Sequence, residues 1–472
     1  MEQQNNPVEI AQSNEQKSVK KRGRRVRMFL RAVAFLLVLG LIFCGATWVF
    51  RIDEVQSYDS LYMFQYEKRG TLDAVYVGGS DVHAFWQPLF GWSDRGIAVW
   101  SYSSGALPVA AMKSMLIEAH KTQPQALFII SLSTFKKSTA SGTIESIHRV
   151  CDYIPFSLNK VRMIHRLTEG EAFSILNKLE MYFPIMRFHS RWDELGNWAF
   201  HAREEDYKAS RHISSFRNDV YDLSKSMVTT DDRDPLPADI EETINEVLDY
   251  CDEAQLNVLF VRVPQASSVD KQARMNTLED IVIARGYPCL DFMENIDVLG
   301  LETKTDYYDT AHTNVHGSLK YSHYLADYLV EHYGFTDKRG TKDWDSWDKA
   351  AEAYIESLRY AVLPYEFEDG LRDYSLAIPK LSTPKKNGTT VTLRWSASEG
   401  ADGYEIFRRC RDGENVWVSI DTVLEDTQYV DEGLLAQTNY RYRVVPYRMI
   451  DGVRAYGNFD VNSVSITTGD KK

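Results

Sequence analysis

Residues 73–83, DAVYVGGSDVH, decide how the largest part of this chain folds. The apolar run up to Gly78 is typical of a strand buried in a parallel sheet. Gly78 and Gly79 then allow a tight turn from strand to helix, which lifts Ser80 above the edge of the sheet. The stretch therefore predicts the first strand–helix unit of an α/β domain.

Further apolar runs occur at residues 96–102, 126–131 and 257–263, with helical patterns between or after them. Buried parallel strands joined by crossover helices give this alternation. We therefore expect a three-layer α/β/α domain with a parallel sheet over residues 55–345. Residues 136–236 interrupt the alternation and are rich in His, Arg and aromatic residues, so we interpret them as a helical insertion over one rim of the sheet.

The character of the sequence changes after residue 345. Residues 346–381 combine a helical, acidic and aromatic stretch with a turn-rich joint, and we expect a helical linker there. Residues 382–468 lack a helical pattern and contain short alternating runs such as TVTLRWSA, GYEIFRRC and NYRYRVVPYR. This second pattern predicts an all-β sandwich.

The N-terminal region contains nineteen consecutive uncharged residues, Ala32–Phe50. At about 1.5 Å per residue, a helix of this length spans roughly 28 Å, close to the hydrocarbon thickness of a bilayer. A cleaved signal peptide is the alternative, but the run is long for one and no A-x-A site follows it. We therefore expect an uncleaved, single-pass helix over residues 28–50, which places the protein in the cell membrane.

The charges before and after this helix predict its orientation. Residues 1–31 carry eight Lys or Arg and three Asp or Glu, a net charge of +5, so the remainder of the −13 chain carries about −18. Positive flanks stay in the cytoplasm, so we expect residues 1–27 inside, as a disordered basic tail, and the bulk of the chain outside. The acidic outer part argues against nucleic acid as a partner.

Two short motifs at opposite ends of the α/β domain carry groups for acyl chemistry. Ser80 follows the buried strand, where it is either a nucleophile or simply the cap of the next helix. Asp309 and His312 lie in the loop before a helical pattern that Asn314 caps. A carboxylate three residues back can hold the Nδ1 proton of His312 and leave Nε2 free to take a proton from serine.

In order and spacing these motifs resemble the SGNH/GDSL hydrolase family, whose domain is a flavodoxin-like α/β/α sheet. Ser80 matches the nucleophile of its first block, and Asp309 and His312 match the Asp-x-x-His of its last block. Gly105, in SYSSGALP, is similar to the second-block glycine, so the resemblance implies that the N–H groups of Ser80 and Gly105 bind an oxyanion. Closest in character are membrane-tethered members that modify cell-envelope polymers.

The third block of that family holds an Asn that also donates to the oxyanion, and this chain has none at the matching place. Its third strand ends in ISLSTF (residues 130–135), where Ser131 or Ser133 offers a hydroxyl instead. One missing donor lowers the rate by about 10²–10³. The departure leaves three expectations open: a slow enzyme, a transferase, or a site that no longer reacts.

Other residues suggest binding with less specificity. Arg187, His189 and Arg191 lie among aromatic residues in the insertion, where the segment either binds an anionic or sugar-like polymer or packs as scaffold. His312 and His316 are four residues apart, but without an H-E-x-x-H pattern no metal site is expected. The five cysteines lack metal spacing as well, and no cofactor is expected.

The C-terminal segment resembles a fibronectin type III module. Trp395 matches the core tryptophan of the second strand in that family, and Leu434 and Tyr440 match its tyrosine corner. Modules of this kind act as spacers or binding units and carry no chemistry. We expect the same here.

Two functions are consistent with the sequence. The first is a membrane-anchored, extracytoplasmic serine esterase or O-acyltransferase that acts on a cell-envelope polysaccharide or related polymer, together with other envelope-modification proteins. The second is a non-catalytic surface protein that retains the α/β shell and binds a partner or a glycan.

Overall fold

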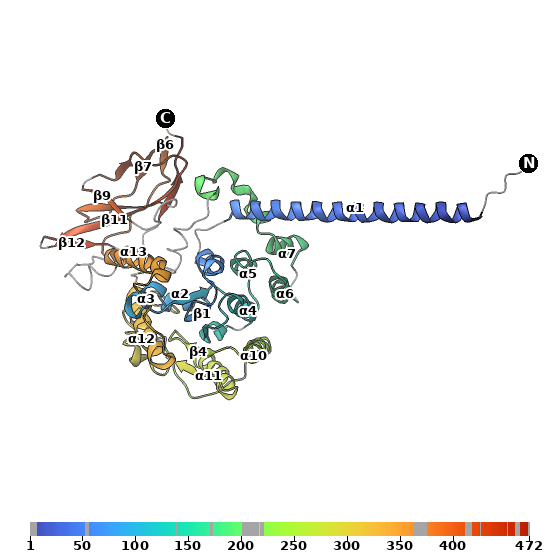
Figure 1. Cartoon of the computed structure of the whole chain (residues 1–472). Coiled ribbons are helices and arrows are strands. Elements are labelled where there is room, and N and C mark those ends of the chain that lie inside the picture. Colours follow the sequence, from blue (N-terminus) through green and yellow to red (C-terminus); the bar gives the residue numbers. More distant parts are fainter. Residues whose placement is uncertain are drawn as a thin grey trace, which may run out of the picture. The chain divides into compact units, whose positions relative to one another are not determined.

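The computed structural model describes residues 7–51, 56–137, 139–169, 173–200, 217, 221–361, 375–410, 418–424, 426–450, 452–457 and 463–470. The chain divides into two compact units, Met1–Arg51 with Pro184–Leu195, and Ile52–Phe183 with Gly196–Lys472. Figure 1 shows the elements of both. Residues 201–216 of the expected insertion and residues 362–374 of the expected linker lie outside the described part.

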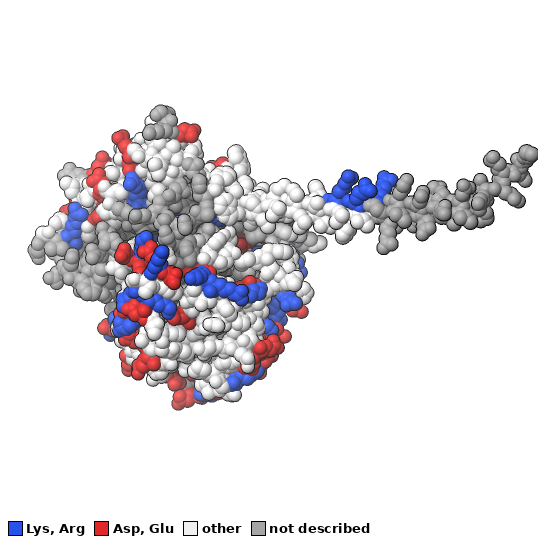
Figure 2. All heavy atoms as spheres, viewed as in Figure 1, with Lys and Arg blue, Asp and Glu red and all other residues white. Residues whose placement is uncertain are grey.

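Helix α1, Pro7–Val49, forms most of the first unit, and its Val26–Val49 part is long and apolar enough to cross a membrane. Figure 2 shows basic side chains at one end of this part and uncharged side chains along it. The helix begins at Pro7, so the expected disordered tail is wrong from residue 7 onward. The Glu, Gln, Lys and Arg residues before the apolar part favour helix, and they extend it backward from the apolar part.

A short segment, residues 185–193, binds the C-terminal end of α1. Helix α8, Ile185–Phe188, contacts α1, and the 3-10 helix η5, His189–Asp193, follows it. Arg191 donates from Nη1 to the carbonyl oxygens of Phe50 at 3.4 Å and of Arg51 at 2.8 Å. The carbonyl groups at the end of a helix have no partner within it, so this guanidinium fixes the segment to the end of the apolar part.

The second unit contains a parallel five-stranded sheet in the order β2-β1-β3-β4-β5. Its strands are β1 Ala74–Gly78, β2 Val99–Ser103, β3 Leu127–Ser131, β4 Val258–Arg262 and β5 Cys289–Asp291. Every residue of the first four is buried, as expected for strands covered on both faces. Because all strands run in one direction, the residues that follow them emerge at the same edge of the sheet.

Helices cover both faces of this sheet (Figure 1). Successive side chains of a strand point to opposite faces, so Val75 and Val77 of β1 enter one core and Tyr76 enters the other. The first core also contains α4 Met112–Thr122, α10 Ala238–Glu253 and α11 Val269–Ala284. The second contains α2 Ser80–Phe85 and α12 Val315–Tyr333. The expected parallel sheet with helices on both faces is thus confirmed.

Helix α13, Asp345–Ala361, packs against α3, Pro88–Arg95, and belongs to the α/β domain. Trp347 is 1% exposed, and its ring lies 5.2 Å from the ring of Trp92. Trp347, Tyr354 and Leu358 repeat at helical spacing and are all buried in the same core. The expected linker over residues 346–381 is therefore wrong up to residue 361, because this helix has an apolar face that the core covers.

The expected insertion contains three short helices before residue 184. They are α5 Ile144–Cys151, α6 Leu158–Leu167 and α7 Ile175–Tyr182, which contact one another. The side chains of Thr143, Ser157 and Ser174 cap them by accepting a backbone N–H bond. Pro184–Leu195 instead groups with α1.

The C-terminal segment is an antiparallel β-sandwich, as predicted. One sheet has the order β10-β7-β6, and the other has the order β12-β11-β8-β9, with β13 paired to β11. The strands are β6 Lys385–Asn387, β7 Thr390–Arg394, β8 Gly403–Cys410, β9 Val418–Val423, β10 Gln428–Asp431, β11 Asn439–Ile450, β12 Val453–Tyr456 and β13 Val464–Thr467. Trp395 lies in the core, and the hydroxyl of Tyr440 accepts the N–H of Leu435 at 3.1 Å.

Candidate active site

The turn between β1 and α2 has space for glycine and for little else. A Cβ atom on Gly78 would lie 2.6 Å from Cγ2 of Val82 and 2.8 Å from Cβ of Ser131. Gly79 caps the helix with an extended backbone, φ −88° and ψ −155°. Ser80 is therefore the first residue of α2, at the carboxyl edge of the sheet.

The structure brings Ser80, His312 and Asp309 together. Nε2 of His312 lies 2.8 Å from Oγ of Ser80, across 232 residues of sequence. Nδ1 of His312 lies 2.9 Å from each carboxylate oxygen of Asp309. The three groups thus form a hydrogen-bonded series: the carboxylate of Asp309 is bonded to the imidazole of His312, and the imidazole is bonded to the hydroxyl of Ser80. This is the geometry needed to remove the serine proton.

The carboxylate of Asp309 also organises its own loop. Oδ1 accepts the N–H groups of Ala311 at 2.7 Å and of His312 at 2.9 Å. Partial burial opposes ionisation of Asp309, but the bonds from His312 and Ala311 outweigh it and hold the pKa of this carboxyl below its ordinary value. Asp309 is therefore a carboxylate at neutral pH, as the orientation of an imidazole requires.

Contacts with both neighbouring elements fix the loop that carries His312. Oγ1 of Thr313 donates to the carbonyl oxygen of Ala84 in α2 at 2.6 Å. Nε2 of Gln265, which follows β4, donates to the carbonyl oxygen of Ala311 at 2.7 Å. Asn314 caps α12 by accepting the N–H of Gly317, as predicted. The base is thus held by α2, by the β4 loop and by its own helix.

A second histidine lies beside the first. Burial, together with the nearby His312, lowers the pKa of His83 to about 3. Nδ1 of His83 lies 3.2 Å from Oγ of Ser103, the last residue of β2. His83 is therefore neutral at physiological pH and adds no positive charge beside His312 when His312 takes up a proton. No spacing rule in the sequence indicated this contact.

A buried polar network of Thr134, Ser131 and Asp81 supports the turn that carries Ser80. Oγ1 of Thr134 accepts the N–H of Gly79 at 2.8 Å and donates to Oδ1 of Asp81 at 3.1 Å. Ser131 donates to the other oxygen of Asp81. Asp81 is buried, and these two hydroxyls satisfy its carboxylate. No sequence signal indicated the role of Thr134, which lies in the same ISLSTF segment as Ser131 and Ser133.

The two serines expected to replace the third-block Asn already have acceptors. The hydroxyl of Ser131 donates to Asp81. That of Ser133 donates to the carbonyl oxygen of Val263 at 3.3 Å and accepts the N–H of the same residue at 2.9 Å. A hydroxyl has a single proton to donate. In this geometry neither serine presents a free donor for an oxyanion.

Gly105 follows β2 and lies next to the serine turn, because Ser104 donates its N–H to the carbonyl oxygen of Gly78 at 3.2 Å. Arg149 of α5 crosses Gly105, with Nη1 3.0 Å from the place where a Cβ atom would stand. Lys137 donates to the carbonyl oxygen of Leu107 in the same loop. A basic rim thus borders the loop that carries Gly105.

Lys136, the neighbour of Lys137 in the sequence, is a third cation and lies against the segment after β4. Its Nζ donates to Oε1 of Gln265 at 2.8 Å and to the carbonyl oxygen of Ala266 at 3.0 Å, and burial lowers its pKa to about 8. Within the described part of the chain, no carboxylate forms an ion pair with Lys136, Lys137 or Arg149. The sequence signal was the pair of lysines directly after the third strand, in a chain of net charge −13.

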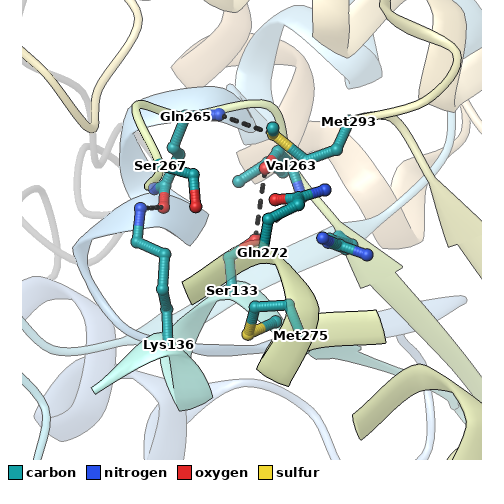
Figure 3. Close-up of a pocket in the computed structure, with 9 residues that line it drawn as sticks. Ser133, Lys136, Val263, Gln265, Ser267, Gln272, Met275 and Met293 are labelled. Atoms are coloured by element: carbon teal, nitrogen blue, oxygen red, sulfur yellow. Dashed lines mark hydrogen bonds between the residues drawn. The ribbon is translucent and has the colours of Figure 1, made fainter. Parts of the chain in front are cut away.

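Figure 3 shows a small cavity beside this rim, lined by Ser133, Lys136, Arg262, Val263, Gln265, Ser267, Gln272, Met275 and Met293. Its volume of about 10 Å³ matches a single water molecule and is too small for a sugar or an acyl chain. Gln265 links its wall to the carbonyl oxygen of Ala311. The residues around the cavity therefore help to hold the loop that carries His312.

Arg187, His189 and Arg191 lie in the first unit, and the structure does not group them with Ser80. Arg187 lies over the ring of Phe188 at 5.8 Å, and Nδ1 of His189 bonds to the carbonyl oxygen of Met186 at 2.8 Å. Arg191 binds the end of α1 and also pairs with Glu194 at 2.7 Å. Substrate binding by these residues remains a prediction.

The fold and the site together define a mixed α/β protein with a hydrogen-bonded serine, histidine and aspartate at the carboxyl edge of a parallel sheet, and with a C-terminal β-sandwich.

No protein-family model matches the chain, and no curated protein matches it. An Fn3-like protein from Clostridium thermocellum is 26% identical with a TM-score of 0.17, over 21% of this chain and 98% of that chain. A β-1,2-glucanase from Parabacteroides distasonis is 17% identical with a TM-score of 0.18, over 21% of this chain and 13% of that chain.

Proposed function

We propose that this protein is a serine esterase or O-acyltransferase of the SGNH type, anchored in the cell membrane and acting outside it on a cell-envelope polymer. The observation that carries the proposal is the 2.8 Å contact between Oγ of Ser80 and Nε2 of His312, with Asp309 at Nδ1. The glycine turn and the start of α2 position Ser80, and a fixed loop positions Asp309 and His312. The arrangement therefore does not depend on a mobile surface side chain. This placement supports catalysis over a simple capping role for Ser80.

In the proposed reaction, Nε2 of His312 takes the proton of Ser80 while Oγ attacks the carbonyl carbon of an ester. The N–H groups of Ser80 and Gly105 stabilise the negative oxygen of the tetrahedral intermediate. The C–O bond to the leaving alcohol then breaks, and His312 returns the proton to that alcohol. The acyl group on Ser80 passes to water in an esterase or to a hydroxyl of the polymer in a transferase.

These three cations, which form no ion pair within the described residues, favour an anionic polymer as substrate. Lys137 and Arg149 border the Gly105 loop, Lys136 is bonded to Gln265 and Ala266 after β4, and the outer chain is acidic as a whole. A local positive field of this kind raises the concentration of an anionic ligand at the site. Phosphate or uronate groups close to the ester would meet this rim.

Arg149→Gln should raise KM for a phosphate-bearing ester by about fivefold, because one charge near the surface is worth roughly 1 kcal/mol, and should leave KM for a neutral ester of the same acyl group almost unchanged. The difference should shrink with added salt. Steady-state kinetics with the two esters measures it. Arg69→Gln is the matched control, because the exposed Arg69 precedes β1 and lies at the opposite edge of the sheet. Equal changes for both esters would contradict an anion-binding role.

We also propose that α1 is an uncleaved anchor with its basic end in the cytoplasm. Arg24 precedes the apolar part, Arg27 and Arg31 lie at its start, and the Arg191 contact follows it, which fits the positive-inside rule. The β-sandwich is proposed to be a fibronectin type III-like spacer or binding module. The bond from the Leu435 N–H to the Tyr440 hydroxyl supports this, because it has the form of a tyrosine corner.

A fluorophosphonate probe tests the proposed nucleophile directly. The full-length protein in nanodiscs is incubated with the probe, digested and examined by mass spectrometry, and the modified peptide should contain Ser80. Serines whose hydroxyls are tied to carbonyl groups, such as Ser93 with Leu89, should remain unmodified. A folded protein without any label on Ser80 would disprove the proposal.

The rival function, a non-catalytic surface protein, has one observation in its favour. Ser131 and Ser133 present no free donor in place of the third-block Asn. The probe decides between the two functions, because an inactive shell would show no labelling of Ser80 while still binding a glycan.

A further inference from the structure

Helices α6 and α7 of the insertion expose an apolar surface. Phe156 is 65% exposed, Leu158 77%, Ile175 81% and Leu176 55%. Leu179 and Phe183 extend it, and the rings of Phe156 and Phe183 stack at 6.1 Å, so the two helices share one surface. We call these six residues the apolar face. A contiguous exposed apolar area of this kind marks an interaction site in a soluble domain.

The course of the chain links this face to the end of α1. Phe183 is followed directly by Pro184, the first residue of the segment that groups with α1. Within that segment Arg191 is bonded to the carbonyl oxygens of Phe50 and Arg51, at the end of the apolar part of α1. Only eight positions of covalent chain separate Phe183 from Arg191.

The composition of this region suits the interface between lipid and water. Trp192, beside Arg191, is 72% exposed, and Trp48 lies near the end of α1 with Arg51 over its ring at 4.7 Å. Tryptophan is enriched at the interface where a membrane helix leaves the bilayer. Helix α7 carries one base and one acid, Lys178 and Glu180, so its association with lipid would depend on apolar contact rather than on charge.

We propose that the apolar face lies in the interfacial layer of the same membrane that α1 crosses, so that the α/β domain is held at the bilayer by a second contact. The inference depends on α1 spanning a membrane and not on the chemistry at Ser80. It commits to lipid as the occupant, because the chain joins the face directly to a segment fixed at the end of the apolar helix. A second copy of the protein is the competing occupant that the experiment must distinguish.

The test uses full-length protein in phosphatidylcholine nanodiscs, in a variant with Cys44→Ser. A cysteine is introduced as Leu176→Cys and labelled with an environment-sensitive fluorophore, and the matched control is Ile283→Cys, an exposed apolar position on α11. The parent without an introduced cysteine gives the background. We expect blue-shifted emission at position 176 and at least about twofold quenching by spin-labelled lipid, with neither effect at position 283.

Three results would overturn the proposal. Equal, water-like emission at both positions would show that the apolar face is not in lipid. Blue-shifted emission at position 176 without lipid quenching, and with cross-linking between chains, would assign the face to a second copy. Unchanged quenching at position 176 when Leu158→Glu and Ile175→Glu are added, in a variant that unfolds at the parent temperature, would show that the apolar side chains are not responsible.

Discussion

Ser80→Ala is expected to remove ester turnover almost completely, with kcat falling by up to about 10⁶ and ending near the background rate. The reason is the position of Oγ, 2.8 Å from the only group placed to take its proton in the described site, Nε2 of His312. Without the hydroxyl no acyl-enzyme can form, and only binding and the oxyanion donors continue to assist water. Steady-state hydrolysis of a chromogenic ester, with the protein in nanodiscs, measures the loss.

Ser93→Ala is the matched control for this variant. Ser93 lies in α3, where its hydroxyl donates to the carbonyl oxygen of Leu89 at 2.8 Å, so its removal costs one surface bond. The control should keep its activity and its unfolding temperature. A Ser80→Ala protein with wild-type turnover would exclude Ser80 as the nucleophile, whatever the substrate.

Asp309→Asn should lower kcat by about 10⁴ and leave KM nearly unchanged. Oδ1 of Asp309 accepts the N–H groups of Ala311 and His312, so the amide oxygen of an asparagine is required at that place. Its NH₂ group then stands where Oδ2 was, 2.9 Å from Nδ1 of His312, and donates toward that nitrogen. The imidazole proton moves to Nε2, and His312 no longer accepts the proton of Ser80.

The tautomer of His312 gives this prediction a readout that a merely structural effect would not change. Nitrogen-15 NMR of labelled histidine should show the proton on Nδ1 in the wild type and on Nε2 in Asp309→Asn. Asp297→Asn serves as the control, because Asp297 lies in a 3-10 helix before the loop and forms no hydrogen bond with His312 within the described residues. Loss of activity with an unchanged tautomer would contradict the orienting role of Asp309.

The sequence predicted the features of the site that depend on short segments. The apolar run before Gly78 became β1, and the three-residue spacing of Asp309 and His312 allowed their bond within one loop. The Asn314 cap was equally local. These features follow from spacing and residue type, so no tertiary information was needed.

The sequence did not predict contacts between distant segments. The bond from Thr134 to Asp81 and the position of Arg149 at Gly105 depend on how three strand ends meet. The role of α13 was missed because a helix with a buried aromatic face and a linker helix have the same pattern until a partner is known. The Arg191 contact joins residues 140 positions apart, which no local pattern shows.

The separation of 232 residues between Ser80 and His312 also determines at what stage of chain synthesis the site can form. Ser80 emerges soon after the apolar helix, while the base is still to be synthesised. At roughly 5–20 residues per second, the interval is about 10–50 s, and α12 must then dock on α2 before the hydroxyl meets the imidazole. Until then the chain carries an inert serine, and the proposed reactivity can begin only with the completed domain.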